Sequence, residues 1–156
     1  MNSYEVLLDE IFSNSNIHVV EAELLNATGL LGVYKEGKGI IIDKNMETEL
    51  KKTTLMEEYM HSKYTVGNIL NQTSIENRKQ ELLARKYAYI ELVPLEALIE
   101  AYSLGLTQYY EVADFLEVDI EFLWDATNYY KSTYGTMFQY KGVLILFSNT
   151  ITMEFK

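Results

Sequence analysis

Two glutamates and a histidine lie close together in this sequence, at Glu57, Glu58 and His61. Apolar residues recur around them at helical spacing, so we expect them on one helix. Residues four apart on a helix project from one face, one turn apart, so Glu57 and His61 can hold a single metal ion. Cysteine is absent, so any metal must be bound by His, Asp or Glu.

A further carboxylate follows on the next predicted helix. Nineteen residues separate His61 from Glu81, the separation found in thermolysin-like zincins. Glu81 also begins an expected inward-facing stripe with Ala84 and Ala88, which would place it beside small residues. In zinc peptidases the matching helix reads His-Glu-x-x-His, with the Glu as general base, whereas Glu57 stands at the first position here. The pattern indicates a zincin-type metal helix with a distal ligand; the alternative is a solvated acidic turn.

Helices and strands that would position these residues are readable from periodicity and from breaker residues. Pro94 is the only proline and ends the helix that carries Glu81. We expect the first three helices at residues 4–12, from residue 46 to near Gly67, and from residue 73 to Pro94, where Thr73 and Glu76 form a capping box. Three more are expected at residues 95–102, 108–116 and 120–130, the last with Asp119 as its N-cap. We expect strands at residues 17–20, as a hairpin within 31–43, and within 137–155.

The fold class predicted from this order is α+β. We expect a mainly helical, zincin-like domain over residues 1–156, with a small sheet or hairpin near the N-terminus and a β-like C-terminal segment. Its parts would be helix plus small sheet at 1–45, metal-site helices at 46–94, a helical part at 95–134, and the β-like segment at 135–156.

The net charge and the hydropathy of the sequence limit the kinds of molecule that this protein is expected to bind. The net charge of -10 disfavours direct binding to nucleic acid or to an anionic membrane, because phosphate contacts need Lys or Arg. No secretion signal or membrane-length apolar run is visible. We therefore expect a soluble, cytoplasmic protein whose partner is a protein or a metal ion. Most of the 13 tyrosines are expected in the core.

Several stretches resemble the ImmA/IrrE metallopeptidase-like proteins of phages and mobile elements. The matching segments are Leu55 to His61, Tyr64 to Gly67, Glu81 to Tyr89 leading into Leu92 to Leu95, and more weakly Val112 to Leu116 with Phe122 and Leu123. Together they cover roughly residues 45 to 135.

This resemblance implies a zinc-dependent peptidase, or a protein derived from one, that acts on a helix-turn-helix repressor and so relieves repression of a mobile element. It assigns Glu58 as general base and His61 and Glu81 as metal ligands. Glu57 takes the place of the missing first ligand.

The chain departs from the family pattern at Glu57 and at Met60, where a small residue is usual. Ligation by Glu57, His61 and Glu81 would cancel the charge of zinc and weaken it as a Lewis acid. A carboxylate in place of a histidine ligand shifts the preference of the site toward harder ions such as Mn. A further alternative is that the site binds no metal. His18 is interpreted as a locally satisfied strand histidine.

The helices over residues 108–130 resemble a DNA-reading helix-turn-helix in their spacing, but their charge argues against it. No Lys or Arg lies between Lys86 and Lys131, while nine acidic residues do. Two hypotheses therefore remain: a metallopeptidase that cleaves a repressor, and a non-catalytic binding module that sequesters one.

Overall fold

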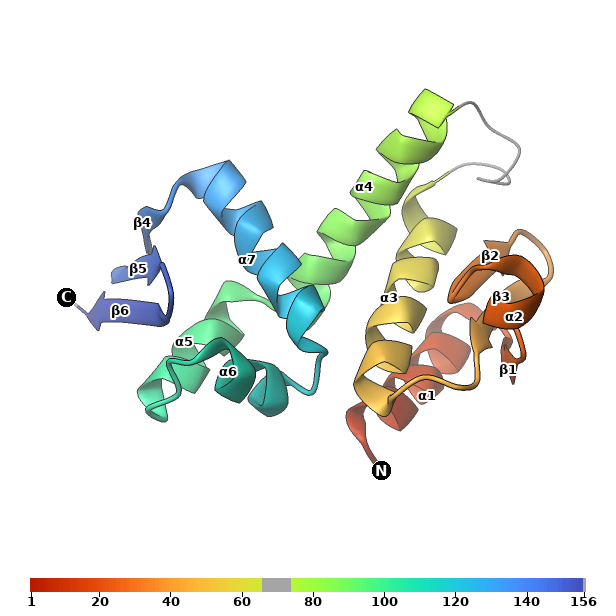
Figure 1. Ribbon diagram of the computed structural model, residues 1–156, viewed down its shortest axis with the longest axis horizontal. Coiled ribbons are helices and arrows are strands. Elements are labelled where there is room, and N and C mark those ends of the chain that lie inside the picture. The colour runs from red at the N-terminus through yellow and green to blue at the C-terminus, as the bar shows by residue number, and fades with distance from the viewer. Residues whose placement is uncertain (66–73, 156) are drawn as a thin grey trace. The chain divides into compact units, whose positions relative to one another are not determined.

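The computed structural model describes residues 1–65 and 74–155 (Figure 1). Helices predominate and two small three-stranded sheets accompany them, one near each end of the chain, which confirms the α+β prediction. The chain divides into two compact units, residues 1–88 and 89–156. The single domain expected over residues 1–156 stays a prediction. Within the described ranges, no helix is long and apolar enough to cross a lipid bilayer.

The first helix, α1 (Ser3–Ser15), begins with a capping box between Asn2 and Glu5. The Asn2 side chain accepts a hydrogen bond from the Glu5 backbone N–H at 2.9 Å, and the Glu5 carboxylate accepts one from the Asn2 backbone N–H at 3.1 Å. Tyr4 and Ile11 are among its buried residues, as the apolar period predicts. The helix ends where Asn16 adopts the left-handed conformation, three residues beyond the predicted end at 12.

The N-terminal sheet has the order β1-β3-β2. Its strands are β1 (Val19–Ala22), β2 (Gly32–Lys35) and β3 (Gly39–Asp43). β2 and β3 form the expected antiparallel hairpin, while β1 pairs with β3 in parallel. β1 begins two residues later than expected, and the short helix α2 (Leu25–Thr28) was not predicted.

The helix α3 (Thr48–Tyr64) packs against β2, β3 and α1 (Figure 1). It contains no Gly or Pro, and Glu49 near its start and Lys63 near its end suit the helix dipole. The following helix, α4 (Ser74–Leu92), buries Ala84 and Ala88 as predicted. The predicted break near Gly67 and the capping residue Thr73 lie outside the described residues.

The second unit contains three further helices and a meander of three strands. The helices are α5 (Leu95–Ser103), α6 (Tyr109–Leu116) and α7 (Ile120–Tyr134), and the antiparallel strands are β4 (Met137–Tyr140), β5 (Val143–Phe147) and β6 (Ile151–Phe155). Asp119 caps α7 as predicted, because its carboxylate accepts a hydrogen bond from the Phe122 N–H at 3.2 Å. α7 runs four residues beyond its predicted end at 130. Leu98, Leu123 and Ile145 are fully buried in the core of this unit.

Candidate functional site

The helix α3 is buried on several sides and carries residues of both the core and the candidate site. Leu55, Met56 and Met60 are buried on this helix, and they anchor it in the first unit. Glu58 and His61, three residues apart, therefore lie on a helix whose orientation is set by packing. The packing that stabilises the fold therefore also fixes the positions of Glu58 and His61.

His61 and Glu81 come together from α3 and α4. The Nε2 atom of His61 lies 3.4 Å from the Glu81 Oε1 atom, while the His61 side chain is only 5% exposed and that of Glu81 is 41% exposed. Tyr64 and Tyr87 stack beside this pair, with ring centroids 3.9 Å apart. The side chains of the two helices thus meet at this point.

The distance between His61 and Glu81 is compatible with shared metal ligation. Two ligands that each lie about 2.0–2.1 Å from a tetrahedral zinc ion are separated by about 3.3–3.4 Å. The observed 3.4 Å also suits an ion pair between an imidazolium and a carboxylate. The spacing of the pair therefore suits either a direct ion pair or two of the ligands of a divalent cation.

Thr65 orients the other side of the imidazole. Its hydroxyl donates to the His61 backbone carbonyl at 2.7 Å and lies 3.4 Å from the His61 Nδ1 atom. Because the hydroxyl proton is used by the carbonyl, the hydroxyl oxygen is free to accept from an Nδ1–H. That tautomer would leave the Nε2 lone pair directed toward Glu81, as a metal ligand requires.

The two partners of this pair perturb each other's ionisation. Burial alone would lower the pKa of His61, but the hydrogen bond with Glu81 and the charges of Glu58, Glu81 and Glu57 raise it overall. The same hydrogen bond holds the pKa of Glu81 below its ordinary value, with Arg85 adding to the effect. Without a metal, the pair therefore favours the charged forms of both groups.

Glu58 is the most strongly perturbed carboxyl of the site. Its pKa is raised from 4.5 to about 7, mainly by burial and also by the neighbouring carboxylates of Glu81 and Glu57, against the opposing effects of His61 and of the Tyr34 N–H. A carboxyl group with a pKa near neutrality is suited to accept and release protons.

Gly32 on β2 makes room for this carboxyl group. A Cβ atom at position 32 would lie 2.7 Å from the Thr54 Cγ2 atom and 3.1 Å from the Glu58 Cγ atom. Only glycine allows the strand to approach α3 so closely without a shift of these side chains. Neither Gly32 nor Tyr34 was singled out by the sequence analysis, because the helix pattern contains no signal for contacts with a distant strand.

Glu57 faces a different neighbour. Its Oε2 atom lies 3.9 Å from the Arg85 Nε atom, one helical turn beyond Glu81 on α4. Over residues 1–65 and 74–155, no group of three or more His, Asp or Glu side chains is placed so that it could hold a metal ion. The structure therefore brings His61 and Glu81 together, with Glu58 near them, and ligation by Glu57 stays a prediction. His18 is exposed and lies against the Phe12 ring, with centroids 5.9 Å apart.

Comparison with known proteins identifies the family. The model of the IrrE N-terminal-like domain, a peptidase family, matches residues 12–124, which include every candidate site residue and more than two thirds of the chain. Proteins of this family are typically zinc-dependent. No curated protein and no solved structure matches the chain. The chain therefore belongs to the IrrE N-terminal-like family and is a metallopeptidase-like protein of the ImmA/IrrE type.

Proposed function

We propose that this chain is a cytoplasmic metallopeptidase that acts on a helix-turn-helix repressor of a phage or mobile element. The observation that carries the proposal is the approach of His61 to Glu81, at 3.4 Å between Nε2 and Oε1, with the half-buried Glu58 on the same helix. Membership of a peptidase family adds independent support.

In this proposal His61 and Glu81 would hold the metal ion, with Glu57 as the third ligand. The ion, when bound, supplies Lewis-acid activation of a water molecule and of the peptide carbonyl. Glu58 acts as general base, and it takes up a proton at its carboxylate and passes it to the leaving amine. The Tyr34 N–H, which donates to this carboxylate, fixes its direction.

The test combines metal content with cleavage. Protein purified without chelator should contain close to one Zn or Mn per chain, and Glu81→Gln should lose most of it. Helix-turn-helix repressors encoded near the gene of this chain are then incubated with wild type and excess Zn or Mn, and fragments are identified by mass spectrometry. We expect Glu58→Gln to bind metal and repressor but to lose cleavage by at least 100-fold.

A matched control for this substitution is Glu49→Gln, which makes the same chemical change at an exposed position of α3. It should cleave like wild type. Equal cleavage by Glu58→Gln and wild type would refute the role of Glu58, and absence of metal under all loading conditions would refute the metal site.

One observation favours a second candidate, a binding module that sequesters the repressor without cleaving it. Glu57 replaces the first histidine of the zinc motif and lies within ion-pair distance of Arg85. In such a module the acidic second unit would attract a basic repressor surface, so binding should weaken with salt. Repressor binding without cleavage, in excess Zn or Mn, would favour this candidate over the peptidase.

A further inference from the structure

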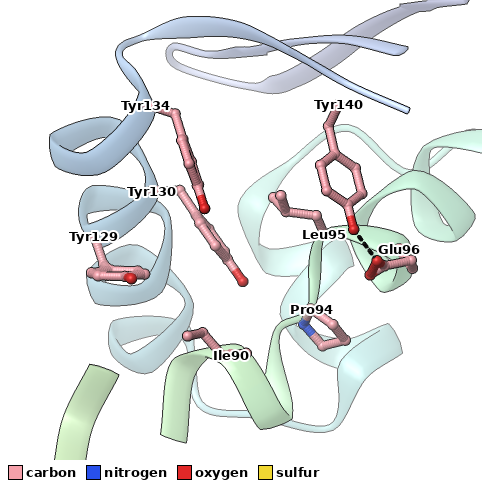
Figure 2. A pocket seen from close by; sticks show the side chains of 8 residues that line it. All are labelled: Ile90, Pro94, Leu95, Glu96, Tyr129, Tyr130, Tyr134 and Tyr140. Carbon is pink, nitrogen blue, oxygen red and sulfur yellow. Dashed lines mark hydrogen bonds between the residues drawn. The ribbon is translucent and has the colours of Figure 1, made fainter. Parts of the chain in front are cut away.

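The second unit contains a pocket whose lining is dominated by tyrosines. The pocket has a volume of about 200 Å³ and lies among the end of α4, the start of α5, α7 and β4. Figure 2 shows the rings of Tyr129, Tyr130 and Tyr134, which project from α7, and that of Tyr140 from β4. Four aromatic rings in one small pocket form a surface with several negative π faces.

The tyrosine rings are held in fixed positions by burial and by hydrogen bonds. Tyr130 is 4% exposed, and its hydroxyl donates to the Val93 carbonyl at 2.8 Å. Its ring lies nearly parallel to that of Tyr134, at 17°, with centroids 6.3 Å apart. Tyr134 is 53% exposed, so the pocket has a solid inner wall and a side that is open to solvent.

A carboxylate stands in this aromatic pocket. Glu96, from the first turn of α5, accepts a hydrogen bond from the Tyr140 hydroxyl (Figure 2). This bond, assisted by Lys141, holds the pKa of Glu96 below its ordinary value, so the group is ionised at neutral pH. Its side chain is 55% exposed, which leaves the carboxylate accessible to an incoming group.

The chain itself already presents a cation to these groups. The Lys141 Nζ atom lies 3.4 Å from the Glu96 Oε1 atom and 5.2 Å from the centre of the Tyr140 ring. Lys141 is 69% exposed, so it occupies the rim without filling the pocket. Because the ammonium group of Lys141 contacts both the ring and the carboxylate, the site is suited to bind a cationic side chain.

The charge of the second unit favours the same kind of ligand. Residues 89–156 contain ten acidic and three basic residues, a net charge of -7 out of the -10 of the whole chain. Such a surface attracts basic protein segments and repels phosphate.

We propose that the tyrosine pocket of Glu96, Tyr130, Tyr134 and Tyr140 is a docking site for a Lys or Arg side chain of a basic protein partner. The side chain enters over the tyrosine rings, pairs with Glu96 and displaces Lys141. Every residue of the pocket lies in residues 89–156, and none belongs to the candidate metal site. The inference therefore does not depend on peptidase activity.

The test uses full-length protein with ¹³C-labelled tyrosine rings, observed by NMR at low ionic strength. Three probes are titrated: five-residue peptides of Gly and Ser with a central Arg, Lys or citrulline. Citrulline has nearly the shape of Arg but carries no charge. We expect saturable shifts of the Tyr134 and Tyr140 ring signals with the Arg or Lys peptide, and at least fivefold weaker binding of the citrulline peptide.

Three variants complete the test, each checked for folding by circular dichroism. Glu96→Gln should weaken binding of the basic peptides at least fivefold, whereas Glu100→Gln, the same change at an exposed position on α5, should alter it less than twofold. Lys141→Gln should strengthen binding at least twofold, because it removes the internal competitor. Equal binding of the citrulline peptide, or unchanged or weaker binding after Lys141→Gln, would overturn the proposal.

Discussion

Replacing the candidate general base should stabilise the metal-free protein, and this can be measured without any substrate. Burial raises the pKa of Glu58 from 4.5 to about 7 in the folded state. The folded chain therefore holds this proton more tightly than the unfolded chain does. Ionisation of Glu58 therefore lowers the free energy of unfolding. This loss is nearly absent below pH 4.5, grows as the pH rises from 4.5 to 7, and is constant above about pH 7.

The size of the effect follows from the two pKa values. A difference from 4.5 to about 7 corresponds to about 3 kcal/mol at pH 8. Glu58→Gln removes this cost but leaves a polar amide in the same half-buried position, so we expect a gain of roughly 1–3 kcal/mol. For a chain of this size that is a rise in Tm of several degrees. At pH 5 the gain should fall to about a quarter of its value at pH 8, that is, below about 1 kcal/mol.

The assay is thermal unfolding followed by circular dichroism in the presence of a chelator, at pH 5 and at pH 8. Glu49→Gln is the control: this exposed carboxyl group in the first turn of the same helix interacts favourably with the helix dipole, so its loss should lower the free energy of unfolding by up to about 1 kcal/mol, opposite in sign to the change expected for Glu58→Gln. A Glu58→Gln protein that is no more stable than wild type at pH 8 would refute the assignment of Glu58 as a buried, destabilised carboxylate.

Three further predictions concern the frame around the site and the pocket. Gly32→Ala should lower stability by about 1–3 kcal/mol, because the added Cβ would lie 2.7 Å from the Thr54 Cγ2 atom; urea unfolding measures this. Tyr130→Phe should cost about 1 kcal/mol in the same assay, since the Val93 carbonyl loses its 2.8 Å hydrogen bond. Backbone hydrogen bonds hold the pKa of Asp43 below its ordinary value of 3.8 in the folded protein. The ionised Asp43 side chain therefore stabilises the fold fully above pH 3.8, and this stabilisation is lost as the pH falls through the lower pKa of the folded state. The Tm difference between wild type and Asp43→Asn should accordingly shrink on acidification, and a constant difference would contradict this.

Much of the fold was predictable because its elements are long and periodic. The helix over α1, the hairpin of β2 and β3, and the Asp119 cap of α7 each depend on residues close together in the sequence. The four-residue helix α2 is too short to show a period, and it was missed. The end of α7 was placed too early because Tyr134 adds a further turn on the same face as Tyr130.

The candidate site was only partly predictable for a related reason. The i, i+3 and i, i+4 spacings on a helix follow from the sequence, and they single out Glu57, Glu58 and His61. The neighbours that set their properties come from other elements, such as Gly32 on β2 and Arg85 on α4. These contacts depend on tertiary packing, which leaves no local pattern.

The tyrosine pocket was not predicted at all. Its rings come from α7 and β4, and the 13 tyrosines of the chain offer no basis in sequence for choosing among them. The expectation that most tyrosines would be in the core is wrong: Tyr4, Tyr59, Tyr109 and Tyr130 are buried, while the other nine are partly or largely exposed.

Because the single helix α3 carries both core residues and site residues, the ways in which this protein can change over time are restricted. An insertion of one residue ahead of Leu55 would rotate everything beyond it by about 100°, so that His61 would leave Glu81 and Met60 would leave the interior together. The chemistry of this helix can therefore vary by exchange of side chains at fixed positions far more easily than by a change in length. Glu57, which stands where a histidine is usual in zinc peptidases, is a variation of that permitted kind.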